Sequence, residues 1–189
     1  MRIAIVSDAW RPQINGVVRT IETIVKLLQV EGHDVEVFGP DRFRTLPCPT
    51  YPEIRLSLFP AARLCHMLRL FAPDAIHLVT EGPLGWAARN FCLARGIPFT
   101  SAYHTRFPEY VRARVRVPLA WSYALVRRFH GPSAAVLVVA QSIRDELAAR
   151  GFKNLVPWSR GVDIAAFKPQ PRADFKDARP IPCPVRSTS

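Results

Sequence analysis

A chain of 189 residues that is 49% hydrophobic and 22% charged is long and apolar enough for one folded domain, which excludes a globally disordered protein. Its formal net charge of +11 suits phosphates or an anionic membrane face, although an arginine-rich proteome would produce the same excess. The chain opens on a strand-like run with no signal-peptide core, and no stretch is long enough to span a bilayer, so we expect a cytoplasmic protein.

Short apolar runs rich in β-branched residues alternate with longer amphipathic runs. The first run predicts a strand at 2–7, and the next predicts a helix at 16–31, where apolar residues recur at helical spacing until Gly32. The pattern continues with strands at 34–38 and 54–58, a helix at 60–71, a strand at 75–79, a helix at 83–95, a strand at 98–103, an irregular helix at 108–130, a strand at 135–140, a helix at 141–150 and a weak strand at 154–157.

This alternation indicates an α/β fold. Continuously apolar strands joined through helices are typical of a mostly parallel sheet that is covered on both faces. Right-handed crossovers then give a doubly wound, Rossmann-like domain, which we predict to span residues 1–168. The segment 169–189 contains five prolines and no usable periodicity, so we predict a disordered tail.

Ligands of such domains bind beside the carboxyl ends of the strands, where two residues are candidates for ligand binding. Gly16 opens the first predicted helix, where free N–H groups and close backbone approach favour phosphate, or where a glycine simply eases the turn. Glu81 follows the strand at 75–79, where it either contacts a polar ligand or interacts with the positive end of the next helix.

A third candidate lies after the strand at 98–103. An imidazole at position 104 suits a sugar hydroxyl or a developing charge, although a lone histidine is more often structural. The candidate is His104, and its neighbours Thr105 and Arg106 could assist in the same loop.

Two basic segments allow more than one interpretation. Arg63, His66 and Arg69 form one stripe of the predicted helix 60–71, which suits either the solvated face of a core helix or contact with an anionic membrane. Segment 106–130 interleaves arginines with aromatic residues, as some single-stranded nucleic-acid binders do. A surface segment with inward aromatic residues is the simpler interpretation, so we expect no nucleic-acid partner.

Metal and redox chemistry find no support in the sequence. The cysteines are widely spaced and form neither a CxxC pair nor a Cys/His cluster, so we expect free thiols and no metal. They are Cys48, Cys65, Cys92 and Cys183. The GxGxxG fingerprint is absent, which argues against a nucleotide-dependent oxidoreductase, and we expect no cofactor.

Four segments in fixed order resemble one known enzyme family. The opening RIAIVSDAWRPQINGVVRTIETIVKLLQVEGHDVEVFGP is followed by TEGPLGWAAR at 80–89, YHTRFPEYV at 103–111 and SRGVDIAAFKP at 159–169. Together they resemble family 4 of the retaining glycosyltransferases. The similarity is strongest to bacterial GDP-mannose-dependent mannosyltransferases and sulfoquinovosyl-lipid synthases.

The resemblance implies a GT-B architecture, in which two Rossmann-like domains face each other across a cleft. This chain would be the N-terminal, acceptor-side half. The implied reaction transfers mannose or a similar hexose from a nucleotide-sugar donor, GDP-mannose or a UDP-sugar, to a lipid or glycan acceptor with retention and without a metal. A lipid acceptor adds the expectation of peripheral contact with the inner face of an anionic membrane.

The resemblance also assigns roles to single residues. His104 would be the catalytic contact to the transferred sugar. The donor diphosphate and sugar would lie over the start of the first helix, at Asn15, Gly16 and Val17. The acceptor or cleft side would include Glu81, Thr105 and Arg106, and the segment leading into the second domain includes Arg160 and Asp163.

The second half of the family pattern does not occur in these 189 residues. That half has a basic phosphate-binding pair and two glutamates eight positions apart. We therefore expect a truncated chain that lacks the donor-binding domain and is inactive alone. The alternative is a non-catalytic remnant that holds a lipid or a partner subunit.

Overall fold

The structure is a computed structural model that describes residues 1–48, 51–104 and 118–159. Residues Met1–Ser159 form one compact unit. The predicted domain end at residue 168, the predicted tail and the first part of the predicted helix 108–130 lie outside the described residues.

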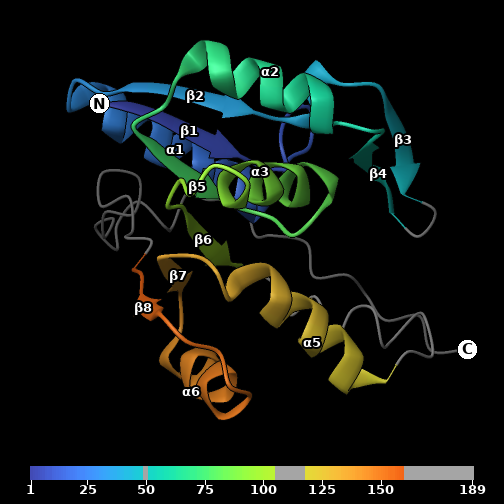
Figure 1. The fold of residues 1–189 in the computed structure, drawn as a ribbon, viewed down its shortest axis with the longest axis vertical. Helices are drawn as coiled ribbons and strands as arrows, with labels where there is room; N and C mark the ends of the chain where they lie inside the picture. The colour runs from blue at the N-terminus through green and yellow to red at the C-terminus, as the bar shows by residue number, and fades with distance from the viewer. Residues whose placement is uncertain (49–50, 105–117, 160–189) are drawn as a thin grey trace, which may run out of the picture. The chain divides into compact units, whose positions relative to one another are not determined.

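A six-stranded parallel sheet forms the centre of this unit (Figure 1). Its strands run in the order β2-β1-β5-β6-β7-β8, and every neighbouring pair is parallel. The strands are β1 (Arg2–Val6), β2 (Asp34–Phe38), β5 (Ala75–Leu78), β6 (Thr100–Tyr103), β7 (Ala135–Val138) and β8 (Leu155–Pro157). The sheet confirms the predicted α/β, Rossmann-like fold.

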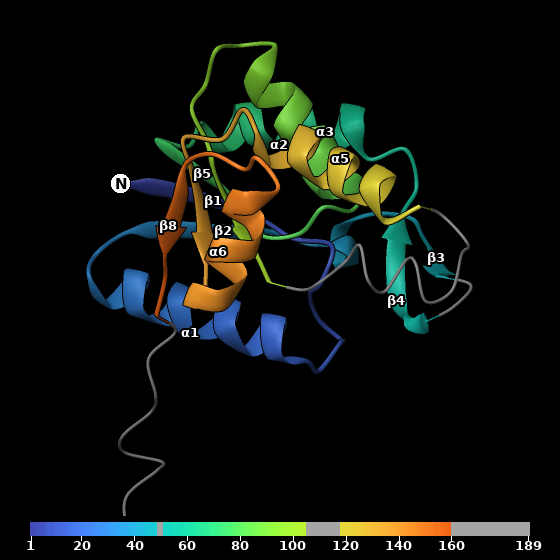
Figure 2. The same cartoon turned by 90° about the horizontal axis from the view of Figure 1, so that it is seen from below.

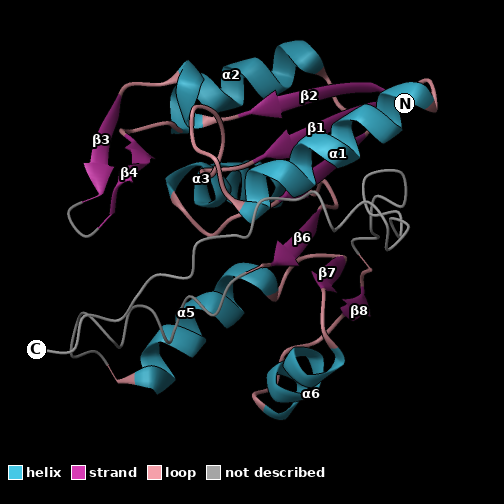
Figure 3. Cartoon of the chain, turned by 180° about the vertical axis from the view of Figure 1, so that it is seen from behind, coloured by secondary structure: helices cyan, strands magenta, loops and turns pink. Residues whose placement is uncertain are grey.

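Helices cover both faces of the sheet. They are α1 (Gly16–Val30), α2 (Ala61–Phe71), α3 (Pro83–Leu93), α5 (Leu119–His130) and α6 (Gln141–Ala149), with a short 3-10 helix η1 (Pro40–Arg42). Figure 2 shows α1 on one side of the sheet and α2, α3 and α5 on the other, and Figure 3 shows α1 running along β1 and β2. Within the described ranges, no helix is long and apolar enough to cross a membrane.

The two layers follow from the alternation of side chains along β1. Ala4 and Val6 pack in the core that α2 and α3 share. Ile3 and Ile5 point to the other face, where they meet Ile21 of α1. Since Ile21 is 1% exposed, its burial stabilises the fold by roughly 1.5–3 kcal/mol.

The start and end of α1 agree with the sequence pattern. Asn15 is the N-cap, and its side-chain oxygen accepts hydrogen bonds from the N–H groups of Val17 and Val18, both at 3.0 Å. At the other end Gly32 has a φ of +82°, and its N–H donates to Gln29 O while the next N–H donates to Leu28 O. This is a Schellman motif, which explains why a glycine stands there.

One predicted strand lies in a different sheet. The strand expected at 54–58 is β4 (Tyr51–Ser57), which pairs antiparallel with an unpredicted strand, β3 (Thr45–Cys48), in a separate two-stranded sheet. The strand itself is confirmed, and the second sheet is a feature that the sequence analysis did not predict. The separate sheet follows from connectivity, because a parallel neighbour needs a crossover of a dozen or more residues, usually a helix, and no α-helix separates β2 from β3 and β4.

Candidate functional site

The carboxyl ends of β1 and β5 form the topological switch point of the sheet. These strands are neighbours, and the helices that follow them, α1 and α3, lie on opposite faces. In open α/β sheets the ligand crevice lies at this point. The two loops that border it are residues 7–15 and 79–82.

Asp8 occupies the α3 side of the switch point. Its carboxylate accepts hydrogen bonds from the N–H groups of Leu84 at 2.9 Å and Gly85 at 3.3 Å, and from the Thr80 hydroxyl at 2.9 Å. Burial nevertheless raises the pKa of Asp8, because desolvation outweighs these hydrogen bonds. The start of α3 is therefore closed by the protein's own side chain, a role that the sequence pattern did not reveal.

The start of α1 is different, because the space around it is open. Asn15 and Gly16 are exposed, and Val17 is partly buried. A Cβ atom built on Gly16 would meet nothing within 4 Å, and Gly16 does not have a positive φ. The turn itself therefore does not require glycine at this position, unlike at Gly32.

His104 directly follows β6 and is partly buried. Its ring lies edge-to-face with the indole of Trp158, with the ring centroids 5.4 Å apart. The backbone N–H of Trp158 donates to Val138 O, which fixes this residue just after β8. Trp158 is a contact that the sequence analysis missed, although an aromatic residue directly after a strand was the available signal.

Glu81 lies beside His130 of α5. Their atoms Oε1 and Nε2 are 3.1 Å apart, while His130 Nδ1 is 2.8 Å from Ser101 Oγ. The order serine, histidine, carboxylate is that of a nucleophilic triad, but Ser101 is 0% and His130 1% exposed, so no substrate reaches them. The network joins the loop after β5 to the end of α5, and Glu81 and His130 lie 49 positions apart in sequence.

The remaining predicted site residues cannot be placed, because Thr105, Arg106, Arg160 and Asp163 lie outside the described residues. In the part of the chain that the structure describes, no three His, Cys, Asp or Glu side chains gather in a way that could hold a metal ion. Cys65 and Cys92 are free cysteines. Burial raises the pKa of Cys92 to about 11, so its thiol stays protonated at neutral pH.

The comparison with known proteins decides the family. The profile of Glycosyltransferase Family 4 matches residues 14–166, which include the start of α1 and the strand before His104. The chain belongs to glycosyltransferase family 4. This membership agrees with the resemblance that the four sequence segments carry.

Relatives of this family 4 chain act on different sugars. It is 30% identical to the GDP-mannose-dependent alpha-mannosyltransferase of Mycolicibacterium smegmatis over 96% of this chain and 55% of the relative. It is 26% identical to the sulfoquinovosyl transferase of Arabidopsis thaliana over 85% of this chain and 35% of the relative. It is also 26% identical to the alpha-monoglucosyldiacylglycerol synthase of Streptococcus pneumoniae, over 89% of this chain and 42% of the relative.

The family 4 chain spans about half the length of the curated relatives it matches, namely 55%, 54% and 46% of the first three. All of these relatives are glycosyltransferases by name. The family therefore identifies the class of chemistry as glycosyl transfer.

Proposed function

We propose that this family 4 chain is the acceptor-side half of a retaining glycosyltransferase. The proposed reaction transfers mannose or a similar hexose from a nucleotide-sugar donor, GDP-mannose or a UDP-sugar, to a lipid or glycan acceptor. The observation that carries the proposal is the family match over residues 14–166, which includes the start of α1, the loop after β5 and His104. The names of the mannosyl and glucosyl relatives support a hexose donor.

The proposed roles of single residues rest on geometry. Asn15, Gly16 and Val17 would lie beneath the donor diphosphate, since the N-terminus of α1 carries a partial positive charge and the space around Gly16 is open. A glycine that the turn does not need is explained if a ligand approaches its backbone closely. His104, held by Trp158 at the end of β6, would donate to the transferred sugar.

A chimera tests the proposal. Residues 1–166 replace the matching half of the M. smegmatis mannosyltransferase, and transfer of labelled mannose from GDP-mannose into a lipid extract is measured. We expect transfer above that of the relative's C-terminal half alone. In the chimera, His104→Ala should lower kcat roughly ten- to a hundredfold if the imidazole is charged, because a hydrogen bond that strengthens in the transition state is lost, while the lost ring contact with Trp158 lowers Tm only slightly.

The alternatives give different results in the same assay. A folded chimera without transfer, with Tm and circular dichroism like those of the parent enzyme, would favour the non-catalytic remnant. A His104→Ala variant with lower Tm and unchanged kcat would make His104 a structural residue.

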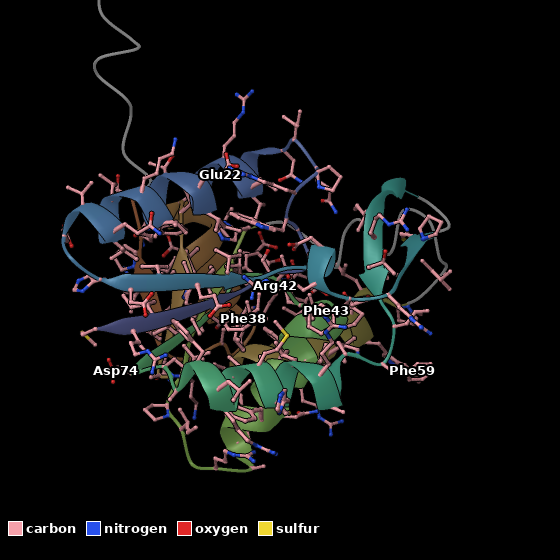
Figure 4. All side chains as sticks on the ribbon, turned by 90° about the horizontal axis from the view of Figure 1, so that it is seen from above. Glu22, Phe38, Arg42, Phe43, Phe59 and Asp74 are labelled. Carbon is pink, nitrogen blue, oxygen red and sulfur yellow. The ribbon has the colours of Figure 1, made fainter. Side chains whose placement is uncertain are left out.

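Peripheral membrane contact belongs to the same proposal. Leu64, Leu68 and Phe71 of α2 are buried, which confirms a core helix, while Arg63, His66 and Arg69 are exposed. Phe59, just before α2, is 95% exposed, and Figure 4 shows its ring pointing away from the surrounding side chains. An exposed aromatic ring beside a basic stripe suits an anionic interface.

Vesicle sedimentation tests this contact. We expect the chain to sediment with phosphatidylglycerol vesicles more than with phosphatidylcholine vesicles, and Phe59→Ser to reduce the bound fraction several-fold. Equal sedimentation with both lipids, or an unaffected Phe59→Ser variant, would contradict membrane contact at α2.

A further inference from the structure

A cavity of about 330 Å³ lies beside the carboxyl ends of β1 and β2, before the start of α1. Three segments that are distant in sequence form its wall: the loop after β1, the segment around η1, and the β3–β4 pair. Its lining includes Arg11, Gln13, Asp41, Phe43, Thr45 and Arg55. No residue of the sequence-based site lies among them.

Gln13 gives the first indication of a ligand. Its side-chain oxygen accepts from Asn15 Nδ2 at 3.3 Å. Its side-chain nitrogen, Nε2, is buried and has no hydrogen-bond partner in the part of the chain that the structure describes. Buried amide groups are rarely left unpaired, so an acceptor atom on a bound molecule is the expected partner.

Charge gives the second indication. The Arg55 guanidinium donates only to Thr45, at 2.8 Å to its hydroxyl and 3.4 Å to its carbonyl oxygen, and no carboxylate pairs with it among the side chains that the structure describes. Arg11 pairs with Glu22 at 2.7 Å, on the exposed side of α1. A third guanidinium, that of Arg63, lies 5.8 Å from the ring centroid of Phe43.

These groups together suit one chemical class of ligand. Arginines bind phosphate through paired N–H donors, and they are the residues of choice where an anion is held in a partly closed site. The amide of Gln13, the hydroxyl of Thr45 and the exposed carboxylate of Asp41 suit sugar or polyol hydroxyls, and Phe43 offers an apolar surface to C–H groups.

We propose that this cavity binds a hydroxylated head group that carries a phosphate, and that this head group is the acceptor; only the second statement rests on the proposed function. The loop residues Arg11 and Gln13 lie a few positions before Asn15, which caps the helix proposed to hold the donor diphosphate. The same loop would thus contact both substrates.

Calorimetric titration of the full 189-residue chain tests the binding without any donor. Glucose 6-phosphate is the probe and glucose is its neutral match. Dihexanoyl phosphatidylglycerol below its micelle concentration, with dihexanoyl phosphatidylcholine as its zwitterionic match, supplies the lipid arm. We expect each phosphate-bearing anion to bind at least tenfold more tightly than its match, and the tighter of the two identifies a free sugar phosphate or a lipid head group as the source.

Two variants locate the binding. Arg55→Met removes the unpaired charge, and Gln13→Leu removes the unpaired donor at similar volume; each should weaken binding about tenfold. Arg95→Met is the matched control, because Arg95 is an exposed arginine after the C-terminal end of α3, at the opposite edge of the sheet. It should leave the affinity unchanged.

Gln13→Leu also separates a ligand contact from a structural role. Because Nε2 has no partner among the described residues, Gln13→Leu should keep or raise Tm while it weakens binding. Equal affinity for glucose and glucose 6-phosphate, or unchanged affinity in both cavity variants, would overturn the proposal. Binding that follows the expected pattern in a chain whose chimera transfers no sugar would leave the cavity standing and remove only the proposed enzyme function.

Discussion

Asp8 shows how one side chain decides which helix start remains accessible. Its carboxylate bonds to two N–H groups of α3, so that helix start has no free room for an anion. The corresponding position of α1 is capped by Asn15, a neutral side chain at the exposed surface. Of the two helices at the switch point, α1 is therefore the one whose start stays open, as the proposed diphosphate site requires.

Removing the Asp8 carboxylate should destabilise the fold. Asp8→Ala leaves the N–H groups of Leu84 and Gly85 without their acceptor, and we expect a loss of about 1–2 kcal/mol in the free energy of unfolding. Urea denaturation measures this loss. Asp34→Ala is the control. The Asp34 carboxylate is exposed and forms a solvent-exposed ion pair with Arg2 at 3.6 Å, so its removal should lower the free energy of unfolding by less than about 0.5 kcal/mol. Equal losses in both variants would contradict the capping role.

His77 should make the stability of the fold depend on pH. Burial lowers the pKa of His77 in β5 to about 4, and its Nδ1 lies 2.8 Å from Thr100 Oγ1. The folded state therefore takes up this proton less readily than the unfolded state, whose histidine has an ordinary pKa near 6.5. The free energy of unfolding is therefore unaffected by His77 above that pH. It falls by about 2–3 kcal/mol as the pH is lowered toward 4.

Urea denaturation of the parent chain and of His77→Gln between pH 7.5 and 4 measures this effect. All other histidines are the same in both proteins, so the difference between the two pH profiles isolates His77. We expect the parent to lose more stability on acidification than the variant. Parallel pH profiles would show that His77 titrates normally.

At the scale of elements, α1 and α3 both begin near a glycine, but the two glycines are required for different reasons. A Cβ on Gly85 would lie 1.9 Å from the carbonyl oxygen of Thr80, whereas a Cβ on Gly16 meets nothing within 4 Å. The first glycine is needed by packing within the fold. The second is not needed by anything in the described structure.

Alanine at each position should therefore give opposite results. Gly85→Ala should reduce the free energy of unfolding by about 2 kcal/mol or more, because the loop after β5 must shift. Gly16→Ala should leave stability unchanged or raise it by up to about 1 kcal/mol, and it should lower transfer in the chimera. A destabilised Gly16→Ala variant with normal transfer would favour a purely structural glycine.

The elements also show what a sequence can predict. Periodicity predicted every strand of the parallel sheet, because buried parallel strands are continuously apolar and the helices between them are amphipathic. It predicted β4 as a strand but not the separate sheet to which β4 belongs, since an apolar run carries no information about its partner strand. It missed the contacts of Glu81 with His130 and of Asp8 with α3, because these pairs depend on tertiary packing between residues distant in sequence.

At the scale of the molecule, residues Met1–Ser159 form a unit with its own core. We predict that limited proteolysis removes segment 169–189 first and leaves a resistant fragment that includes this unit. The proline-rich segment has little apolar surface to offset an ordering cost of about 1–2 kcal/mol per residue. Mass spectrometry identifies the fragments, and an initial cut between residues 40 and 100 would contradict the prediction.

The position of β1 in the sheet has a consequence for how the chain folds during synthesis. Arg2 pairs with Asp34 of β2, so β1, α1 and β2 can associate as soon as about forty residues have left the ribosome. Pairing with β5, where Ile3 meets Ala75, closes a loop roughly twice as long, which costs about 0.6 kcal/mol more. Until β5 has been synthesised, one hydrogen-bonding edge of β1 is unpaired and can pair with a strand of another chain. We therefore expect aggregation to begin from this incomplete, newly synthesised chain.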